Sequence, residues 1–158
     1  MAFITEQQAL ITEKNGDLLK VNLKSASRTP INGLPSDLVD SIGVHDSRDN
    51  SGLFEVLLDP EFSENNLIYL SYSAQGDSGT TTKVIRAQLQ DNELSNLETL
   101  LVGNPYNQEL FHYGGGMTFG VDGKLYVTID ERYYREDRPT KPSDFPKPGG
   151  CPGKNLPH

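Results

Sequence analysis

The residues best suited to chemistry lie in one stretch, residues 109–132, with the sequence ELFHYGGGMTFGVDGKLYVTIDER. His112 precedes a run of three glycines, and the acidic pair Asp130 and Glu131 follows the second of two short apolar segments. An imidazole acts as a general base only when its tautomer is fixed and its ring is open to substrate. Glycines let the backbone approach a flat ligand closely, and a carboxylate on the next strand could orient the ring. The pattern predicts an active-site rim on a β-hairpin, with a purely structural histidine as the alternative.

The other reactive side chains support weaker hypotheses. His45 lies in the polar loop VHDSRDNSG, where it either lines the rim of the site or is simply solvated, and His158 is terminal. Cys151 is the single cysteine, so no internal disulfide can form, and no base stands beside it in the sequence. The histidines lack metal-ligand spacing and the acidic residues form no calcium loop, so we expect no metal site in this chain.

Composition narrows the class of protein. The chain has 158 residues, enough for one ordinary domain, and a formal net charge of -8. An acidic surface repels phosphates and argues against a nucleic-acid partner. No apolar run approaches the ~18 residues that a membrane-spanning helix needs. The first residues lack a basic region followed by an apolar core, so we expect no signal peptide in this chain.

A hairpin that carries a site must be held by further strands, and strand patterns dominate the sequence. No long segment has apolar residues at helical spacing with caps at both ends. Short segments with strand character are joined by turn sequences such as Lys14-Asn15-Gly16. The predicted strands are residues 9–13, 17–23, 53–58, 67–73, 82–89, 94–102, 117–119 and 124–129. Hairpins without intervening helices predict an antiparallel all-β fold.

A weak internal repeat adds detail to this fold class. Phe3, Leu58 and Phe119 recur about 55 to 60 residues apart, each followed by a turn and a second apolar segment. This period suits one four-stranded blade of a β-propeller with its loops. Residues 1–132 would then hold about two and a half blades, whereas a closed propeller needs at least four. We therefore expect the chain to be part of a larger protein.

The last part of the chain has a different composition. Residues 133–158 contain six of the ten prolines together with several glycines. Proline removes the donor that a strand or helix needs. We expect an irregular tail here, whether native or the result of a shifted reading frame.

Three sequence segments resemble one known family. MAFITEQQALITEKNGDLLKV, DNSGLFEVLLDPEFSENNLIYLSYS and HYGGGMTFGVDGKLYVTIDER are similar, in this order, to segments of the PQQ-dependent soluble glucose and aldose (sorbosone-type) sugar dehydrogenases. The resemblance covers residues 1 to about 132. It implies part of a six-bladed β-propeller, a sugar substrate, an external electron acceptor and a parent protein that is periplasmic or secreted.

The resemblance also implies roles for single residues. The family oxidises an aldose at the anomeric carbon to the lactone, with hydride transfer to PQQ, and has Ca²⁺ at the cofactor. His112 stands at the position of the general base, which also contacts the cofactor. Glu131 stands where the family has an aspartate that orients this base. Asn50 stands where the family has a glutamine that contacts PQQ; both side chains are amides that donate and accept hydrogen bonds.

The sequence departs from the family pattern at several positions. Phe111 replaces an aspartate of glucose-type members, Gly116 replaces an arginine, and Asp130 replaces a glycine, which would strain the chain if that glycine had a positive φ. The family's calcium ligands and the basic partners of PQQ lie in later blades. We therefore expect this chain to be inactive alone. The alternative function is a non-catalytic propeller segment that acts as a binding or interaction module.

Overall fold

The computed structural model of the chain describes residues 1–39 and 49–131. The described residues form strands, turns and one short helix, α1 (Phe62–Asn65). This confirms the predicted all-β class, with no helix longer than about two turns in the described ranges. The predicted tail, residues 133–158, lies outside these ranges, as do His45 and Cys151. No helix in the described part of the chain is long and apolar enough to cross a membrane.

The first sheet is an antiparallel meander of four strands in sequence order. They are β1 (Ala2–Thr5), β2 (Gln8–Thr12), β3 (Leu18–Asn22) and β4 (Arg28–Pro30). The predicted turn between β2 and β3 is present, with Gly16 at φ 95°, a conformation that glycine adopts at little cost. Residues 9–13 and 17–23 are thus correctly predicted as a strand pair.

The second sheet has the same order and is larger. Its strands are β5 (Leu53–Leu58), β6 (Leu67–Gly76), β7 (Gly79–Gln90) and β8 (Glu93–Val102). Helix α1 lies between β5 and β6 and ends at Asn66, which adopts the left-handed conformation with φ 55°. The third sheet is the predicted hairpin, β9 (Gly114–Phe119) and β10 (Leu125–Ile129).

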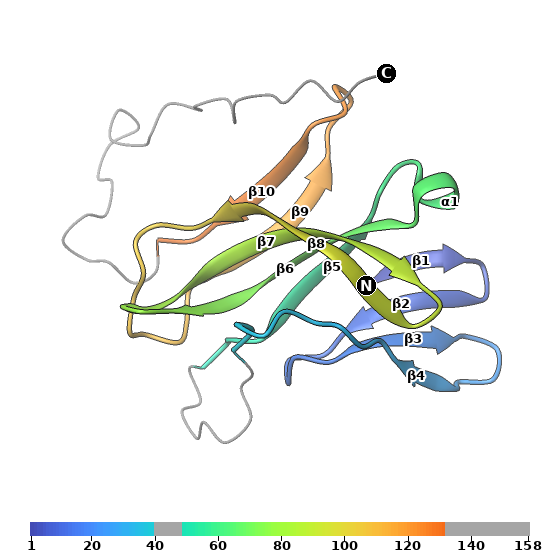
Figure 1. Ribbon diagram of the computed structural model, residues 1–158, viewed down its shortest axis with the longest axis horizontal. Coiled ribbons are helices and arrows are strands. Elements are labelled where there is room, and N and C mark those ends of the chain that lie inside the picture. The colour runs from blue at the N-terminus through green and yellow to red at the C-terminus, as the bar shows by residue number, and fades with distance from the viewer. Residues whose placement is uncertain (40–48, 132–158) are drawn as a thin grey trace.

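The sequence repeat corresponds to this arrangement. Phe3, Leu58 and Phe119 each lie in the first strand of their sheet, in β1, β5 and β9. Strand β5 contacts β1 on one side and β9 on the other, so the first strands of the three sheets are neighbours. The sheets follow one another in space, from the blue β1–β4 through the green β5–β8 to the orange β9–β10 (Figure 1). This is the succession expected of propeller blades.

The second sheet is covered on both faces. On one face the side chains of Leu10 and Leu18 from the first sheet pack with Ile68, Leu70 and other residues of the second. On the opposite face Tyr69 and Val84 pack with Met117 of β9. The alternation of side chains along each strand lets one sheet serve two cores. Packing on the second of these faces fixes the hairpin β9–β10 against β6 and β7.

The predicted strand boundaries were too narrow around β6 and β7. The prediction ended at residue 73 and resumed at residue 82, whereas the two strands pair as far as Gly76 and Gly79. Thr80, Thr81 and Thr82 are buried although polar, because their hydroxyl groups bind backbone carbonyls of other segments. Strand β4 was absent from the predicted set, and β1 entered only as the first segment of the repeat at Phe3, because both strands are short.

Candidate active site

His112 stands two residues before β9, and its backbone is in the left-handed region with φ 59°. A residue other than glycine holds this conformation only when its surroundings fix it. Phe111 is 7% exposed and packs its ring edge-on to the imidazole, with 5.2 Å between the ring centroids. The side chain of His112 is 41% exposed. The backbone therefore presents the imidazole at the surface beside a buried aromatic ring.

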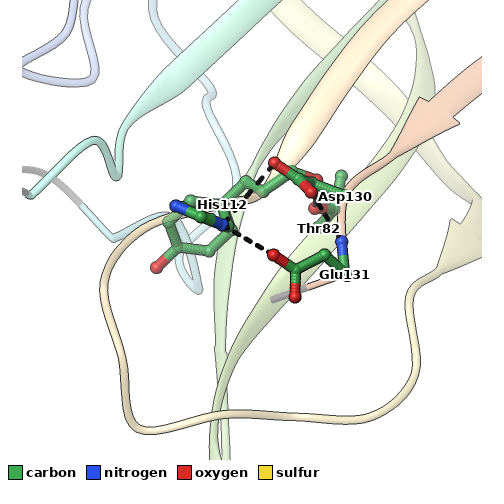
Figure 2. A network of polar contacts seen from close by, with 5 residues as sticks. Thr82, His112, Asp130 and Glu131 are labelled. Atoms are coloured by element: carbon green, nitrogen blue, oxygen red, sulfur yellow. Dashed lines mark hydrogen bonds and ion pairs between the residues drawn. The ribbon is translucent and has the colours of Figure 1, made fainter. Parts of the chain in front are cut away.

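Two carboxylates approach the same nitrogen of this ring. Nδ1 of His112 lies 3.1 Å from Oε1 of Glu131 and 4.0 Å from Oδ2 of Asp130. Both acidic residues follow β10, and Figure 2 shows their side chains converging on the imidazole. The backbone N–H of Glu131 donates to Oδ1 of Asp130 at 2.7 Å, which fixes the Asp130 carboxylate. Glu131, at hydrogen-bonding distance, is the partner of His112, and Asp130 contributes charge nearby.

This geometry determines the tautomer that the pair favours. An ionised carboxylate only accepts hydrogen bonds, so the Nδ1–H group of His112 donates a hydrogen bond to Oε1 of Glu131. In the neutral ring the lone pair then resides on Nε2. A ring nitrogen with a lone pair, opposite a nitrogen anchored by a carboxylate, has the chemistry of a general base.

Tyr113, the residue after His112, is anchored from several sides. Its side chain is 1% exposed, and its ring packs on that of Phe54 with 5.2 Å between centroids. Its hydroxyl lies 2.8 Å from Oγ1 of Thr80. Its carbonyl accepts from Oγ1 of Thr82 at 2.5 Å and from the backbone N–H of Asp130 at 3.3 Å. The segment that carries His112 is therefore tied to both β7 and the end of β10.

The second sheet holds β9 by side chains that bind its backbone. Besides the bond from Thr82, Oγ of Ser71 in β6 donates to the carbonyl of Gly115 at 2.5 Å. The backbone N–H of Met117 donates to Oε2 of Glu55 in β5 at 2.5 Å. The strands β5 and β6 thus each contribute one polar side chain to the backbone of β9, and β7 contributes Thr82 to Tyr113, the residue directly before β9. These three contacts set the height and direction of β9 on the face of the second sheet.

The glycine run has separate structural roles at its three positions. Gly114 and Gly115 have φ values of 76° and 97°, where other residues are strained. A Cβ atom on Gly115 would lie 2.6 Å from Cδ2 of Phe54, so only glycine fits there. Gly116 is exposed, and the atom that a Cβ would meet first is Oγ1 of Thr128 at 3.0 Å. Gly114 and Gly115 are therefore needed for the backbone conformation, whereas Gly116 leaves the backbone of β9 exposed to solvent.

Asn50, the predicted cofactor contact, is joined to the site through its backbone. Its N–H donates to the carbonyl of Leu110 at 2.9 Å, and Leu110 lies two residues before His112. Asn50 itself is exposed to solvent. The neighbouring Asp49 is 4% exposed, and its Oδ1 accepts from both N–H and Oγ of Ser51 at 2.7 and 2.6 Å. The loop before β5 is thus fixed beside the segment that leads to His112.

The departures from the family pattern have distinct structural outcomes. Asp130 does not adopt a positive φ, so the strain expected at this position is absent. Phe111 is buried rather than presented to the surface, and it supports the imidazole instead of offering a polar group.

One group of described residues has the donor atoms that a metal ion would need. The donor atoms of His112, Asp130 and Glu131 lie within 4.8 Å of one another. Calcium takes six to eight oxygen ligands, whereas this group offers a ring nitrogen and two carboxylates. The group does not fit calcium, and its hydrogen bond between Nδ1 and Oε1 accounts for the arrangement without an ion.

Sequence reasoning found the pair His112 and Glu131 but missed the residues that hold it. Thr80 and Thr82 lie in β7, about thirty residues before the histidine, and nothing in the local motif identifies them. The available signal was the run of three threonines, Thr80 to Thr82, near the start of β7. A buried hydroxyl requires a partner, and such a run predicts a polar contact across the sheet face.

Comparison with known proteins places this geometry in a family. The family model described as Glucose / Sorbosone dehydrogenase matches residues 1–150. The aldose sugar dehydrogenase YliI of Escherichia coli is 28% identical over 139 residues, which cover 85% of this chain and 35% of that protein. The quinoprotein glucose dehydrogenase B of Acinetobacter calcoaceticus is 27% identical over 136 residues, 80% of this chain and 27% of that protein. The chain thus spans about a third of the length of these relatives.

Solved structures agree with the sequence comparison. The crystal structure of the soluble aldose sugar dehydrogenase of Escherichia coli in the apo-form has a TM-score of 0.72 and 28% identity, covering 85% of this chain and 38% of that one. The PQQ-bound form of an aldose sugar dehydrogenase from Streptomyces coelicolor shares the fold, with a TM-score of 0.65 at 20% identity, covering 80% of this chain and 35% of that one. The three sheets are therefore part of a β-propeller. From its sequence and its fold, the chain belongs to the glucose/sorbosone dehydrogenase family.

Proposed function

We propose that this chain forms part of a PQQ-dependent sugar dehydrogenase and carries its general base. The substrate would be an aldose, oxidised at the anomeric carbon to the lactone. The single observation that carries the proposal is the contact of 3.1 Å between Nδ1 of His112 and Oε1 of Glu131 at an exposed ring. Family membership and the quinoprotein among the relatives support the reaction class.

The roles of the chain's own residues follow from this pair. Nε2 of His112 takes the proton of the anomeric hydroxyl as the C1–H bond breaks and the C1–O bond becomes a carbonyl. Glu131 holds the ring through Nδ1 and stabilises the imidazolium that forms. When bound, PQQ would supply the acceptor for the hydride from C1, and an external electron acceptor would be needed to reoxidise it.

Part of a cofactor site is compatible with the described residues. A flat molecule needs an open backbone surface, and the exposed Gly116 beside Gly114 provides one at the end of the hairpin. The amide of Asn50 can donate to and accept from a quinone or carboxylate edge. The carboxylates of PQQ also require cationic partners, and calcium requires further oxygen ligands. We assign these two tasks to the remainder of the complete protein.

The test compares His112→Gln with wild type in the complete protein, by steady-state sugar oxidation and by titration with PQQ. A general base typically contributes ~10²–10⁴-fold to the rate, so kcat falls by that factor while the affinity for PQQ changes little. Asp122→Asn, at the opposite end of the same hairpin, is the matched control and leaves both unchanged.

Three outcomes would contradict the proposal. Wild-type turnover in His112→Gln would remove His112 from the mechanism. A loss of PQQ affinity that parallels the loss of rate would make it a cofactor ligand instead of a base. Absence of sugar oxidation in the wild-type complete protein loaded with PQQ and calcium would favour a non-catalytic binding module.

A further inference from the structure

We propose that Thr82 is a positioning residue for the pair His112 and Glu131, acting through the carbonyl of Tyr113. The expected effect of Thr82 on turnover rests on the proposed function. Its expected effect on the position of His112 does not depend on any reaction. Figure 2 shows Thr82 on the strand behind the three converging side chains. Thr82 is 0% exposed and therefore cannot contact substrate itself.

The carbonyl oxygen of Tyr113 joins the two halves of the site. A carbonyl has two lone pairs and can accept two hydrogen bonds. Here it accepts from Oγ1 of Thr82 at 2.5 Å and from the backbone N–H of Asp130 at 3.3 Å. Through this oxygen, Tyr113, which follows His112, is hydrogen-bonded to Asp130, which precedes Glu131. The position of this oxygen sets the distance between the imidazole and its carboxylate.

Thr82 is the stronger of the two donors to this oxygen. The distance from Asp130 N exceeds the usual range for N–H···O bonds, whereas the distance from Thr82 is at the short end for hydroxyl donors. Water does not compete for the hydroxyl because Thr82 and Tyr113 are both buried. Without the hydroxyl, the carbonyl would lose the shorter of these two hydrogen bonds and keep the longer one from Asp130. The peptide bond after Tyr113 would then be held less firmly.

The backbone conformation of His112 depends on contacts such as the hydrogen bond from Thr82 to Tyr113. The φ of 59° at His112 is a conformation that a residue with a side chain leaves unless neighbouring contacts prevent it. The peptide bond between Tyr113 and Gly114 contains the carbonyl that Thr82 holds. If this peptide bond is held less firmly, Tyr113 and the adjoining His112 can shift together relative to Glu131. We therefore expect the hydrogen bond between His112 and Glu131 to depend on the Thr82 hydroxyl.

The same strand provides a matched control. Thr81 is 1% exposed, and its Oγ1 donates at 2.9 Å to the carbonyl of Gly103, on the opposite face of the sheet. Thr81→Val and Thr82→Val each remove one buried hydroxyl and leave one buried carbonyl with a donor fewer. They should destabilise the fold similarly, but only Thr82→Val acts on the His112 segment.

The experiment reads the tautomer of His112 by NMR of the intact protein labelled with ¹⁵N-histidine, with His112→Gln used for assignment. Wild type and Thr81→Val should show a ring protonated mainly at Nδ1, as the bond to Glu131 requires. Thr82→Val should lose this preference, and Thr82→Ser, which keeps the hydroxyl, should restore it. In turnover, kcat of Thr82→Val should fall by up to about 100-fold, the scale of a small misplacement, while KM stays close to that of Thr81→Val.

An unchanged tautomer in folded Thr82→Val would overturn the inference, and so would an equal change in Thr81→Val. If the valine variant does not fold, Thr82→Ala and Thr82→Ser decide, because both lose the methyl group and only serine keeps the donor. The tautomer is measured without substrate. A failure of the proposed function, in which His112→Gln keeps its rate, is therefore distinguishable from a failure of this inference.

Discussion

His112 and Glu131 are 19 positions apart in the sequence, yet Nδ1 and Oε1 of their side chains lie 3.1 Å apart. The antiparallel pairing of β9 with β10 brings the two ends of the hairpin together. Because Asp130 lies at 4.0 Å from the same nitrogen, the two carboxylates can be ranked by substitution.

We predict that Glu131→Gln lowers kcat by about 10- to 100-fold, the size of loss seen when the carboxylate that orients a metal-bound histidine is removed. An amide can still contact the ring, but it neither fixes one tautomer nor stabilises an imidazolium. Asp130→Asn should lower kcat less than about 5-fold, because a half-exposed charge at this distance contributes at most about 1 kcal/mol. Steady-state rates of both variants check the ranking, and a larger loss in Asp130→Asn would reverse the assignment.

The glycine run provides a test of stability. Gly115→Ala should reduce the free energy of unfolding by about 2 to 5 kcal/mol, because the new Cβ adds backbone strain and overlaps the ring of Phe54. Gly123→Ala is the control: its φ of 72° is also positive, but a Cβ there meets no atom within 4 Å. It should cost about 1 to 2 kcal/mol from strain alone. Urea unfolding measures both, and equal losses would show that Phe54 moves aside.

A partly buried polar network joins the segment after β4 to the second sheet and should be sensitive to substitution. Asp37 accepts from the hydroxyl of Tyr72 at 2.9 Å and from Nζ of Lys83 at 2.7 Å. Asp37→Asn should cost about 1 to 3 kcal/mol, because the charged acceptor shared by Lys83 and the buried Tyr72 is lost. Glu98→Gln, which breaks the more exposed pair with Arg86, should cost less than about 1 kcal/mol. Thermal or urea unfolding distinguishes the two, and equal costs would contradict the difference in burial.

The lowered pKa of Asp59 predicts how the free energy of unfolding depends on pH. Burial alone would raise the pKa of Asp59, but hydrogen bonds from Asn65, Glu61 N–H and Tyr69 outweigh it and lower the pKa below its ordinary value of 3.8. Its stabilising contribution is therefore complete above that value and is lost as the pH falls through the lowered pKa. Asp59→Asn should destabilise the protein near neutral pH, with a difference from wild type that shrinks well below pH 3.8.

Unfolding midpoints of Asp59→Asn and wild type across this range measure the effect. Glu64→Gln, at an exposed position next to the same turn, serves as the control and should follow wild type throughout. A difference for Asp59→Asn that stays constant with pH would show that the side chain acts by shape and not by charge.

The sequence predicted the features that depend on local pattern. The strand pairs around Gly16 and Gly123 follow from turns and alternation, whereas the choice of Glu131 as the partner of His112 came from the family resemblance. The left-handed backbone of His112 and the contact from Thr82 could not be predicted in this way. Both depend on how the third sheet lies on the second, which side-chain packing decides. For Asn50, the structure fixes the backbone beside Leu110, and the predicted contact of its side chain with the cofactor stays a prediction.

The three contacts from Glu55, Ser71 and Thr82 have a consequence for sequence variation. Their partners in β9 and beside it are backbone atoms, which every amino acid carries. Exposed side chains of the hairpin can therefore be exchanged without loss of these three contacts, within the limits set by the glycines and by the packing of Met117 on Tyr69 and Val84. Substitutions at the three donor and acceptor positions cannot be compensated by the hairpin. A library that transplants hairpins between family members should accept many inserts while these three residues are kept, and few once they are changed.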